Sequence, residues 1–295
     1  MSQPAEVHVR FFQPPIGMRR YFTTFYLMET SVAGGLRVTD HLHPEWGNLR
    51  FHSGDVPDAD VAGGMMLSGS SFAATGPSSK AVRFTIGNTR MWGVGLLPLG
   101  WAKFVRTSAT SLANGVIDGH THPAFASFEP LAAALFGAQH DDVAELARIT
   151  AHFAARIAEP VADEVRITAI HAALIDPDVA SVADIVARAG VGQRTVERIC
   201  NRAFGFSPKL LLRRQRFMRS LVHFMLDPTL KWIGAIDGHY HDQAQFVRDF
   251  HDFMGMTPSE YAALDKPILG AIVQARARFA GAAAQALDGP AGGGS

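Results

Sequence analysis

Cysteine is nearly absent from this chain of 295 residues, in which Cys200 is the single example. One cysteine excludes an internal disulfide framework and is typical of a reducing compartment. The chain also lacks an apolar run of about 18 residues or more, and residues 1–10 lack the basic-then-apolar order of a signal peptide. We therefore expect a cytoplasmic protein with no membrane partner.

An excess of charge of one sign is absent too, because 27 basic residues are matched by 27 acidic ones. The two signs are nevertheless separated along the chain. Residues 188–219 contain nine Arg and Lys and one acid, whereas residues 221–265 contain seven acids and two bases. A basic cluster is typical of phosphate binding, since Lys and Arg that neutralise phosphates release condensed counterions. A solvated helical surface has the same charge pattern, so the cluster alone leaves both interpretations open.

Composition and periodicity indicate a folded α+β protein. Hydrophobic residues make up 47% and charged residues 18% of the chain, and its length suits two domains that each bury a core. Residues 7–110 alternate short apolar runs with Gly, Pro, Ser and Asn, which predicts strands near 20–28, 49–51, 82–86 and 92–97. The period becomes helical from Phe128 onward.

One helical stripe in this later part has two interpretations. Its apolar members are Val143, Leu146, Ile149, Phe153 and Ile157, and Pro160 closes it. The stripe either packs within its own domain or forms the seam of a homodimer. Further on, the segment after Lys266 is rich in alanine, and residues 290–295 are expected to be disordered.

A helix-turn-helix pattern lies between residues 181 and 203. Ser181 is a helix cap, Gly190 ends the helix that follows, and a second helix is expected over 193–203. Val196 and Ile199 would face inward. The outward positions would be Gln193, Arg194, Glu197, Arg198, Asn201 and Arg202. Arg pairs with guanine edges or phosphates, and Gln or Asn with adenine, so this second helix predicts a surface that reads a major groove.

The segments that follow resemble the DNA-binding domain of the AraC/XylS family. They are Gly205-Phe206-Ser207-Pro208-Lys209, Arg213-Arg214-Gln215-Arg216-Phe217, Asp242-Gln243-Ala244-Gln245-Phe246 and Gly255-Met256-Thr257-Pro258-Ser259-Glu260-Tyr261. The resemblance covers about 100 residues and implies two helix-turn-helix units joined by a long helix over 208–224. Each Gly would end a recognition helix in a left-handed turn, and each Pro would open the next helix. The partner implied is double-stranded DNA, with phosphate contacts from Lys209, Arg213 and Arg214.

The second unit departs from the family pattern. It has His239-Tyr240 before Asp242, where Gly followed by an aromatic residue is usual, and Gln245 where His is frequent. Its recognition helix, over about 241–253, offers His241, Gln243, Gln245, Arg248 and His251 together with three acids. Asp242 is most simply a helix-start residue. Because its negative charge repels phosphate, the second unit is expected to contribute less to DNA binding than the first. This contribution is expected to grow below about pH 6.5.

A metal site in the N-terminal part is not expected. Gly35, His41 and His43 fit the opening of the cupin metal signature, but Glu45 follows too soon and no second histidine segment occurs. His120 and His122 are interpreted as surface loop residues, and Cys200 as a core residue. The segments 44–49 and 93–100 resemble a sensor-domain family found on AraC-type regulators.

The predicted organisation is a sheet-rich, cupin-like or related sensor domain over 1–127 and a helical linker over 128–162 with a dimerisation role. An AraC-type DNA-binding domain over 163–265 and an Ala/Gly-rich tail over 266–295 follow. The predicted function is a sequence-specific transcription regulator controlled by a small-molecule effector or a partner, with RNA polymerase a further candidate partner. The alternatives are a cupin-like metal-dependent enzyme and a ligand-independent DNA binder. We predict no catalytic residues, no metal and no cofactor.

Overall fold

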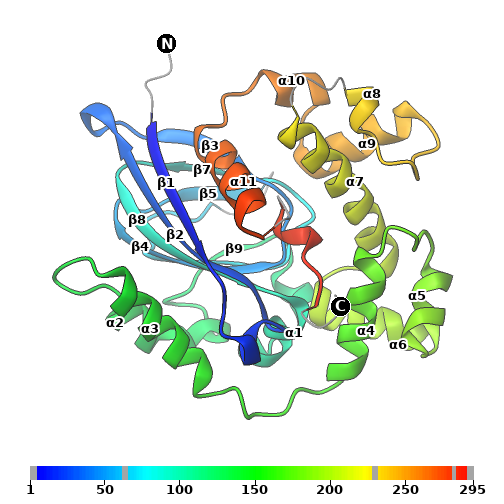
Figure 1. The fold of residues 1–295 in the computed structure, drawn as a ribbon, viewed down its shortest axis with the longest axis horizontal. Helices are drawn as coiled ribbons and strands as arrows, with labels where there is room; N and C mark the ends of the chain where they lie inside the picture. The colour runs from blue at the N-terminus through cyan, green and yellow to red at the C-terminus, as the bar shows by residue number, and fades with distance from the viewer. Residues whose placement is uncertain (1–4, 62–65, 228–231, 281–283, 291–295) are drawn as a thin grey trace.

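The computed structural model describes residues 5–61, 66–227, 232–280 and 284–290. The N-terminal half contains two antiparallel sheets (Figure 1). The larger sheet has the order β1-β2-β8-β4-β6-β9 and the smaller one β3-β7-β5. The strands are β1 Ala5–Phe12, β2 Phe22–Val32, β3 Val38–Leu42, β4 Gly47–Gly54, β5 Asp58–Val61, β6 Phe72–Thr75, β7 Val82–Ile86, β8 Thr89–Leu96 and β9 Val116–Asp118. The expectation of a sheet-rich N-terminal half is confirmed.

Glycines of the larger sheet make room for side chains of neighbouring strands. A Cβ at Gly93 would lie 2.0 Å from a ring carbon of Tyr26, and one at Gly95 would lie 2.1 Å from the Thr23 hydroxyl oxygen. At the end of this segment, a Cβ at Gly100 would lie 2.0 Å from the Tyr21 carbonyl oxygen. The 93–100 motif thus has a steric cause, because any larger residue at these positions would displace a packed neighbour.

Helices α2 (Glu129–Ala134) and α3 (Asp142–Ala154) cover one face of the larger sheet (Figure 1). Ile149 and Phe153 of the predicted stripe are buried there, whereas Val143 is 80% exposed and lies off the packed face. Glu145 is fully buried and its carboxylate accepts hydrogen bonds from Arg90 and from the Trp92 indole, at 2.6 Å for the latter. Much of the stripe therefore packs within the chain, while a dimer role stays a prediction.

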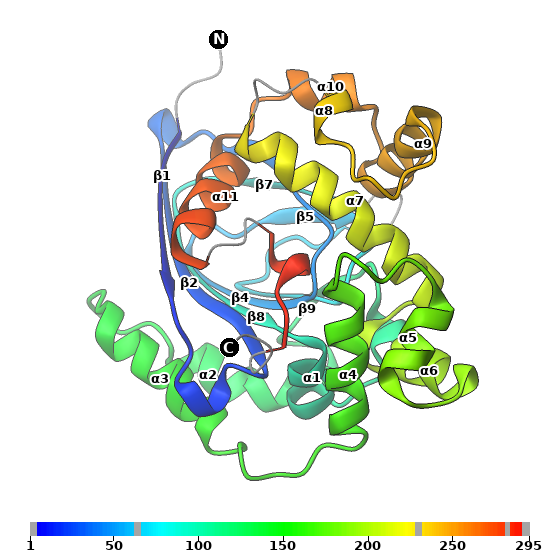
Figure 2. The same ribbon diagram turned by 45° about the vertical axis from the view of Figure 1, so that its right-hand side comes forward.

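The C-terminal half is helical. Its helices are α4 Glu164–Ile175, α5 Val182–Ala189, α6 Gln193–Ile199, α7 Pro208–Leu226, α8 Trp232–Ala235, α9 Gln243–Met254, α10 Pro258–Ala263 and α11 Pro267–Ala280. A π-helical turn, Cys200–Phe204, extends α6 to the end predicted for it. Helices α6 and α9 lie toward the two ends of α7, on the side of the molecule away from the sheets (Figures 1 and 2).

Helix α11 occupies much of the segment that the sequence marks only as an Ala-rich tail. The helix packs against β1, β3 and α7, beside the open edge of the two sheets (Figure 2). Buried Asp40 of β3 accepts hydrogen bonds from the Ile268 and Leu269 amides, at 2.9 and 2.8 Å, and so caps the start of α11. Of the end expected to be disordered, residues 291–295 lie outside the described residues.

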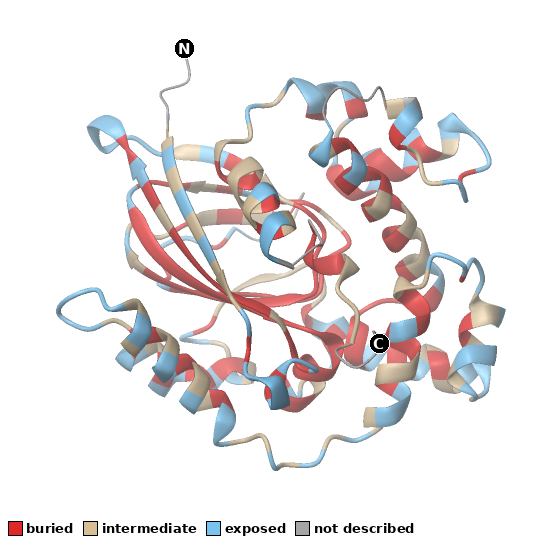
Figure 3. Ribbon diagram, in the orientation of Figure 1, coloured by how far each residue is buried: buried red, intermediate tan, exposed pale blue. Residues whose placement is uncertain are grey.

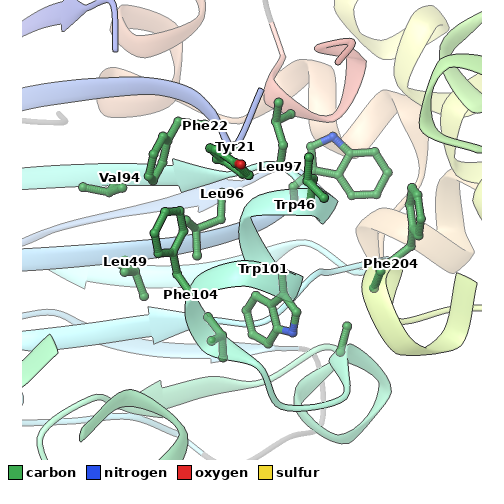
Figure 4. Close-up of a cluster of buried hydrophobic side chains, with 14 of the residues drawn as sticks. Tyr21, Phe22, Trp46, Leu49, Val94, Leu96, Leu97, Trp101, Phe104 and Phe204 are labelled. Carbon is green, nitrogen blue, oxygen red and sulfur yellow. The ribbon is translucent and has the colours of Figure 1, made fainter. Parts of the chain in front are cut away.

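One hydrophobic core crosses from the sheets into the helical half. It joins residues of the sheet half, such as Leu49 of β4 and Trp101 of the turn after β8, to Ile185, Val196 and Phe204 of the first helix-turn-helix unit. Figure 4 shows part of this cluster, with Trp46 and Phe204 on opposite sides of the junction and their ring centroids 5.8 Å apart. The length of the chain predicts two domains that each bury a core, and in this structure one cluster is shared between the two halves.

Candidate DNA-binding surface and the cavity behind it

The first helix-turn-helix unit forms as the sequence predicts. The Ser181 hydroxyl and the Asp184 carboxylate make reciprocal capping bonds at the start of α5, and Gly190 ends that helix with φ +63°. Gly205, with φ +86°, ends the recognition segment, and Pro208 is the first residue of α7. These residues satisfy the free amides at each helix start and permit the left-handed turn at each helix end.

The outward positions of the first recognition helix lie on the surface, as Figure 3 shows for the outer face of α5 and α6. Gln193, Arg194, Arg198, Asn201 and Arg202 are exposed, and Glu197 is half-buried and accepts a 2.9 Å hydrogen bond from Gln193. Val196 and Ile199 are buried as predicted. Contact of these outward residues with bases or phosphates remains a prediction.

An acidic residue restrains two of these arginines. Asp163, which precedes α4, lies 3.0 Å from the Arg198 guanidinium and 4.0 Å from that of Arg202, and it also pairs with Arg166. Hydrogen bonds from Arg166 and Arg198 lower the pKa of Asp163, so it is ionised at neutral pH. Part of the positive charge of the recognition helix is therefore compensated inside the protein.

The three basic residues assigned to phosphate contacts on α7 have different surroundings. Lys209 is exposed. Arg213 is half-buried and pairs with Asp249 and Asp252 of α9. Arg214 is fully buried. For Arg214 the phosphate assignment is wrong in this structure, because its guanidinium has no access to solvent.

Arg214 instead joins the two halves of the chain. Its guanidinium carbon lies 3.9 Å from the centre of the Trp46 indole, and Nη1 donates to the Ser78 carbonyl at 2.9 Å and to the Glu45 carbonyl at 3.4 Å. Nε and Nη2 have no partner among the described residues, and burial lowers the pKa of Arg214 to about 9. The 44–49 motif is thus part of the junction with the first unit.

The second helix-turn-helix unit is also ordered by capping bonds. Asp242 caps α9 through the Gln245 amide, which confirms its interpretation as a helix-start residue. Tyr240, at the departure from the family pattern, is buried and donates a hydrogen bond to Asp249 at 3.1 Å. Gly255 ends α9 with φ +71°, and Thr257 and Glu260 form a capping box on α10.

The candidate contact residues of α9 lie at its start and on its outer face. His241, Gln243, Arg248 and His251 are exposed. Gln245 is half-buried, and its side-chain oxygen accepts a 3.3 Å bond from the His241 amide. Their contact with DNA remains a prediction, as it does for the first unit.

Both recognition helices are held to the sheet half near their C-terminal ends. The Thr110 hydroxyl donates to the Asn201 carbonyl at 2.7 Å. The Ala81 amide donates to the Phe253 carbonyl at 2.7 Å, and Lys80 donates to the Asp252 carbonyl. The orientation of each recognition helix is thereby tied to loops of the sheet half.

The histidines of the cupin-like segment do not form a metal centre in the part of the chain that the structure describes. His43 is buried, and its Nε2 lies 2.7 Å from the Tyr261 hydroxyl oxygen of α10. His120 interacts with Glu129, and His122 caps the turn Pro123–Phe128. Cys200 is buried, as predicted, and burial raises the pKa of its thiol to about 12.

A cavity lies between the two sheets, with α11 as one wall. Its lining includes Met28, His52 and Phe84 from the strands and Ile268 and Ile272 from α11. The volume of the cavity that a water-sized molecule can occupy is about 50 Å³, and the cavity is partly open to solvent. A second hollow next to it shares four lining residues, namely Tyr26, Leu42, Arg50 and Ile272. The cavity was not predicted, because its lining comes from segments more than 200 residues apart in the sequence.

No helix in the described residues is long and apolar enough to cross a bilayer. A family model described as a helix-turn-helix domain matches residues 185–263. No curated protein matched the sequence. Three similar solved structures are of ToxT from Vibrio cholerae.

The first ToxT structure, at 1.65 Å resolution, is 11% identical with a TM-score of 0.44 over 88% of this chain and 98% of that one. The second is ToxT from strain O395 bound to (E)-4-(8-methylnaphthalen-1-yl)but-3-enoic acid. It is 12% identical, with a TM-score of 0.43, over 88% of this chain and 98% of that one. The third is ToxT from strain SCE256 with unsaturated fatty acid bound. It is 10% identical, with a TM-score of 0.38, over 89% of this chain and 96% of that one. The family match over residues 185–263 identifies this part of the chain as a helix-turn-helix domain of the AraC type, which is a DNA-binding domain.

Proposed function

We propose that this regulator reads two successive major-groove segments with α6 and α9, and that an effector in the cavity between the sheets controls this reading. The observation that carries the proposal is the position of α11, which lines the cavity and is joined to the end of α10 by only three residues, 264–266. A change in the cavity wall therefore reaches the second helix-turn-helix unit through a very short connection.

The spacing of the two recognition helices supports the DNA part of the proposal. Helix α7 separates them and has 19 residues, which corresponds to about 28 Å at 1.5 Å per residue. Successive major-groove segments on one face of DNA lie about 34 Å apart. The proposal is tested by in vitro selection from random duplexes with the full chain. Enriched sites should carry two conserved elements one helical turn apart, and a single element would contradict two-unit reading.

The control part of the proposal rests on the contacts that hold the two units in place. Asp40 caps α11 from the sheet half, and Arg214 fills the junction under Trp46. An effector that shifts Ile268 or Ile272 would move the start of α11 relative to this cap. The proposal also places domain boundaries at residues 127, 162 and 265. Helix α11, which follows the last boundary, packs on the sheets and does not form a free tail.

Arg194→Ala is expected to weaken binding to a selected site by about 1 to 3 kcal/mol, the range for a good base contact. Arg194 is exposed and has no ion-pair partner in the described part of the chain, so it is free to reach DNA. Gln243→Ala is expected to cost less, since α9 has acids at both ends, Asp242 and Asp252. Mobility-shift titration of both variants measures the difference, and equal losses would contradict the asymmetry.

Asp163→Asn is expected to tighten binding to all duplexes by about 1.5- to 5-fold, the equivalent of one exposed ion pair. The substitution releases Arg198 and Arg202 from their acidic partner, and the freed charges attract phosphate. Asp176→Asn is the matched control, because it removes the same charge from a pair with Arg188, outside the recognition helix. Titrations at two salt concentrations measure both, and an unchanged or weaker Asp163→Asn complex would show that this pair does not limit binding.

A further inference from the structure

The cavity side of strand β4 carries a row of polar residues where a sheet interior is normally apolar. Asn48, Arg50 and His52 alternate with Leu49 and Phe51, so the three polar side chains share one face of the strand. All three are buried. The rest of the cavity lining is almost entirely apolar, with residues such as Met28, Phe84 and Ile268. Such a row costs free energy unless each polar group has a partner.

Arg50 has its partners within the protein. Its guanidinium donates to the Glu45 carboxylate at 2.6 Å, to the Tyr26 hydroxyl at 3.0 Å and to the Thr75 hydroxyl at 3.1 Å. Burial opposes the charge of Arg50, but Glu45 and Tyr26 raise its pKa above the usual arginine value. Arg50 and Glu45 together carry no net charge. The side-chain amide of Asn48 also has a partner and donates to the side-chain oxygen Oε1 of Gln285 at 3.4 Å.

His52 differs from its neighbours because neither of its ring nitrogens has a hydrogen-bond partner among the described residues. The residue is 7% exposed and lines the cavity. Burial, together with the charge of Arg50, lowers the pKa of His52 to about 3, so the imidazole is neutral. A neutral imidazole offers one donor and one acceptor. The two unpaired nitrogens are buried beside an otherwise apolar pocket, and His52 is the described lining residue whose polar atoms lack a partner.

We propose that the cavity binds a small, uncharged, mostly apolar molecule with one hydroxyl or carbonyl group, and that His52 is its hydrogen-bonding partner. This inference rests on the proposed control by an effector and specifies the chemical class of that effector. The apolar lining of the sheets and α11 would contact the body of the molecule. The occupant would therefore touch Ile268 and Ile272, the two residues through which the cavity adjoins the start of α11.

The charges in the cavity argue against an anionic occupant. Arg50 is the guanidinium that lines the cavity, and Glu45 already compensates it at 2.6 Å. A carboxylate would enter the apolar space without a free counter-ion, and burial of an unpaired charge is costly. A neutral hydroxyl or carbonyl avoids this cost and satisfies His52.

The test uses three probes of the same shape, namely p-cresol, toluene and p-toluate, with calorimetric titration of the full chain at neutral pH. We expect p-cresol to bind the wild-type protein about 5-fold more tightly than toluene, the equivalent of one net hydrogen bond. His52→Leu should bring this ratio to about 1, since leucine fills similar space without a polar atom. His52→Gln, which keeps a donor and an acceptor, should restore a preference for p-cresol.

Four outcomes would overturn the inference. They are equal binding of p-cresol and toluene by the wild type, a preference for p-cresol that survives His52→Leu, tightest binding of p-toluate, and failure of all three probes to bind. DNA binding of the same preparations is measured in parallel. If DNA binding is intact while the probe results fail, the ligand class is wrong and the DNA-reading proposal stands. Loss of DNA binding in the wild type would contradict the proposed function itself.

Discussion

Acidification from about pH 7.5 to about pH 5.5 is expected to lower the free energy of unfolding by about 4 kcal/mol. His43, His52 and His171 are buried, and burial lowers the pKa of each to about 3. In the unfolded chain each imidazole takes up a proton near pH 6.5. Between these two values the unfolded state binds more protons, so stability falls as the pH falls. Each histidine contributes about 1.4 kcal/mol by pH 5.5.

Urea unfolding at the two pH values measures this effect, with the midpoint and slope fitted together. Asp40 and Asp288 act in the opposite direction, because burial raises their pKa. The lower limit near pH 5.5 keeps the measurement above the range where most carboxylates titrate. His52→Leu is the control, because it has one buried histidine fewer. On acidification its free energy of unfolding should fall by about two thirds as much as that of the wild type. Equal stability at both pH values would show that the three histidines are not buried as neutral groups.

This prediction limits how the pH response of DNA binding is measured. The second unit is predicted to contribute more to DNA binding below about pH 6.5, the ordinary imidazole value. The same acidification weakens the fold through the buried histidines. Footprinting therefore has to be done at a pH where unfolding measurements show that the chain is still folded.

Arg214→Glu is expected to reduce the free energy of unfolding by about 3 to 5 kcal/mol, the cost of an uncompensated buried charge. The new carboxylate would face the Glu45 and Ser78 carbonyl oxygens, which now accept bonds from Arg214. It would also lose the contact with the face of Trp46, which attracts a cation and repels an anion. The loss is expected at the junction between the sheets and the first unit.

Lys209→Glu is the matched control, with the same change of charge at an exposed site in the first turn of the same helix. Its effect on unfolding should stay within about 0.5 kcal/mol, while its DNA binding should weaken at every sequence. Denaturant unfolding and mobility-shift assays on both variants separate the two roles. An Arg214→Glu protein as stable as the wild type would contradict the buried position of this residue.

The local features of the helical half could be predicted because short-range chemistry determines them. Ser181, Gly190 and Asp242 act through amides and turns a few residues away, and the structure confirms each. The burial of Arg214 depends on tertiary packing. One signal for it was present, since Arg214 lies three residues after Leu211 and four before Met218, on the apolar face of α7. The neighbouring basic residues masked this periodicity.

The sheet half was predicted to the level of its strands but not of its cavity. Apolar runs and turn residues locate β2, β4, β7 and β8 well. The cavity depends on the packing of α11 beside the sheets, and α11 has no sequence motif beyond its alanine content. The Glu45–Arg50 pair joins residues five apart in the sequence, yet its place beside the cavity follows only from the fold.

The contact of α11 with the sheets has a consequence for synthesis of the chain. Asp40 acquires its partners at residues 268 and 269, and Thr24 accepts a hydrogen bond from Arg276, 252 positions later. At about 5 to 20 residues per second, a ribosome needs on the order of 10 to 50 s between Asp40 and α11. During that time the sheet half has an incomplete wall and an exposed apolar interior. Folding of the first-made half is therefore expected to finish only after α11 has emerged from the ribosome.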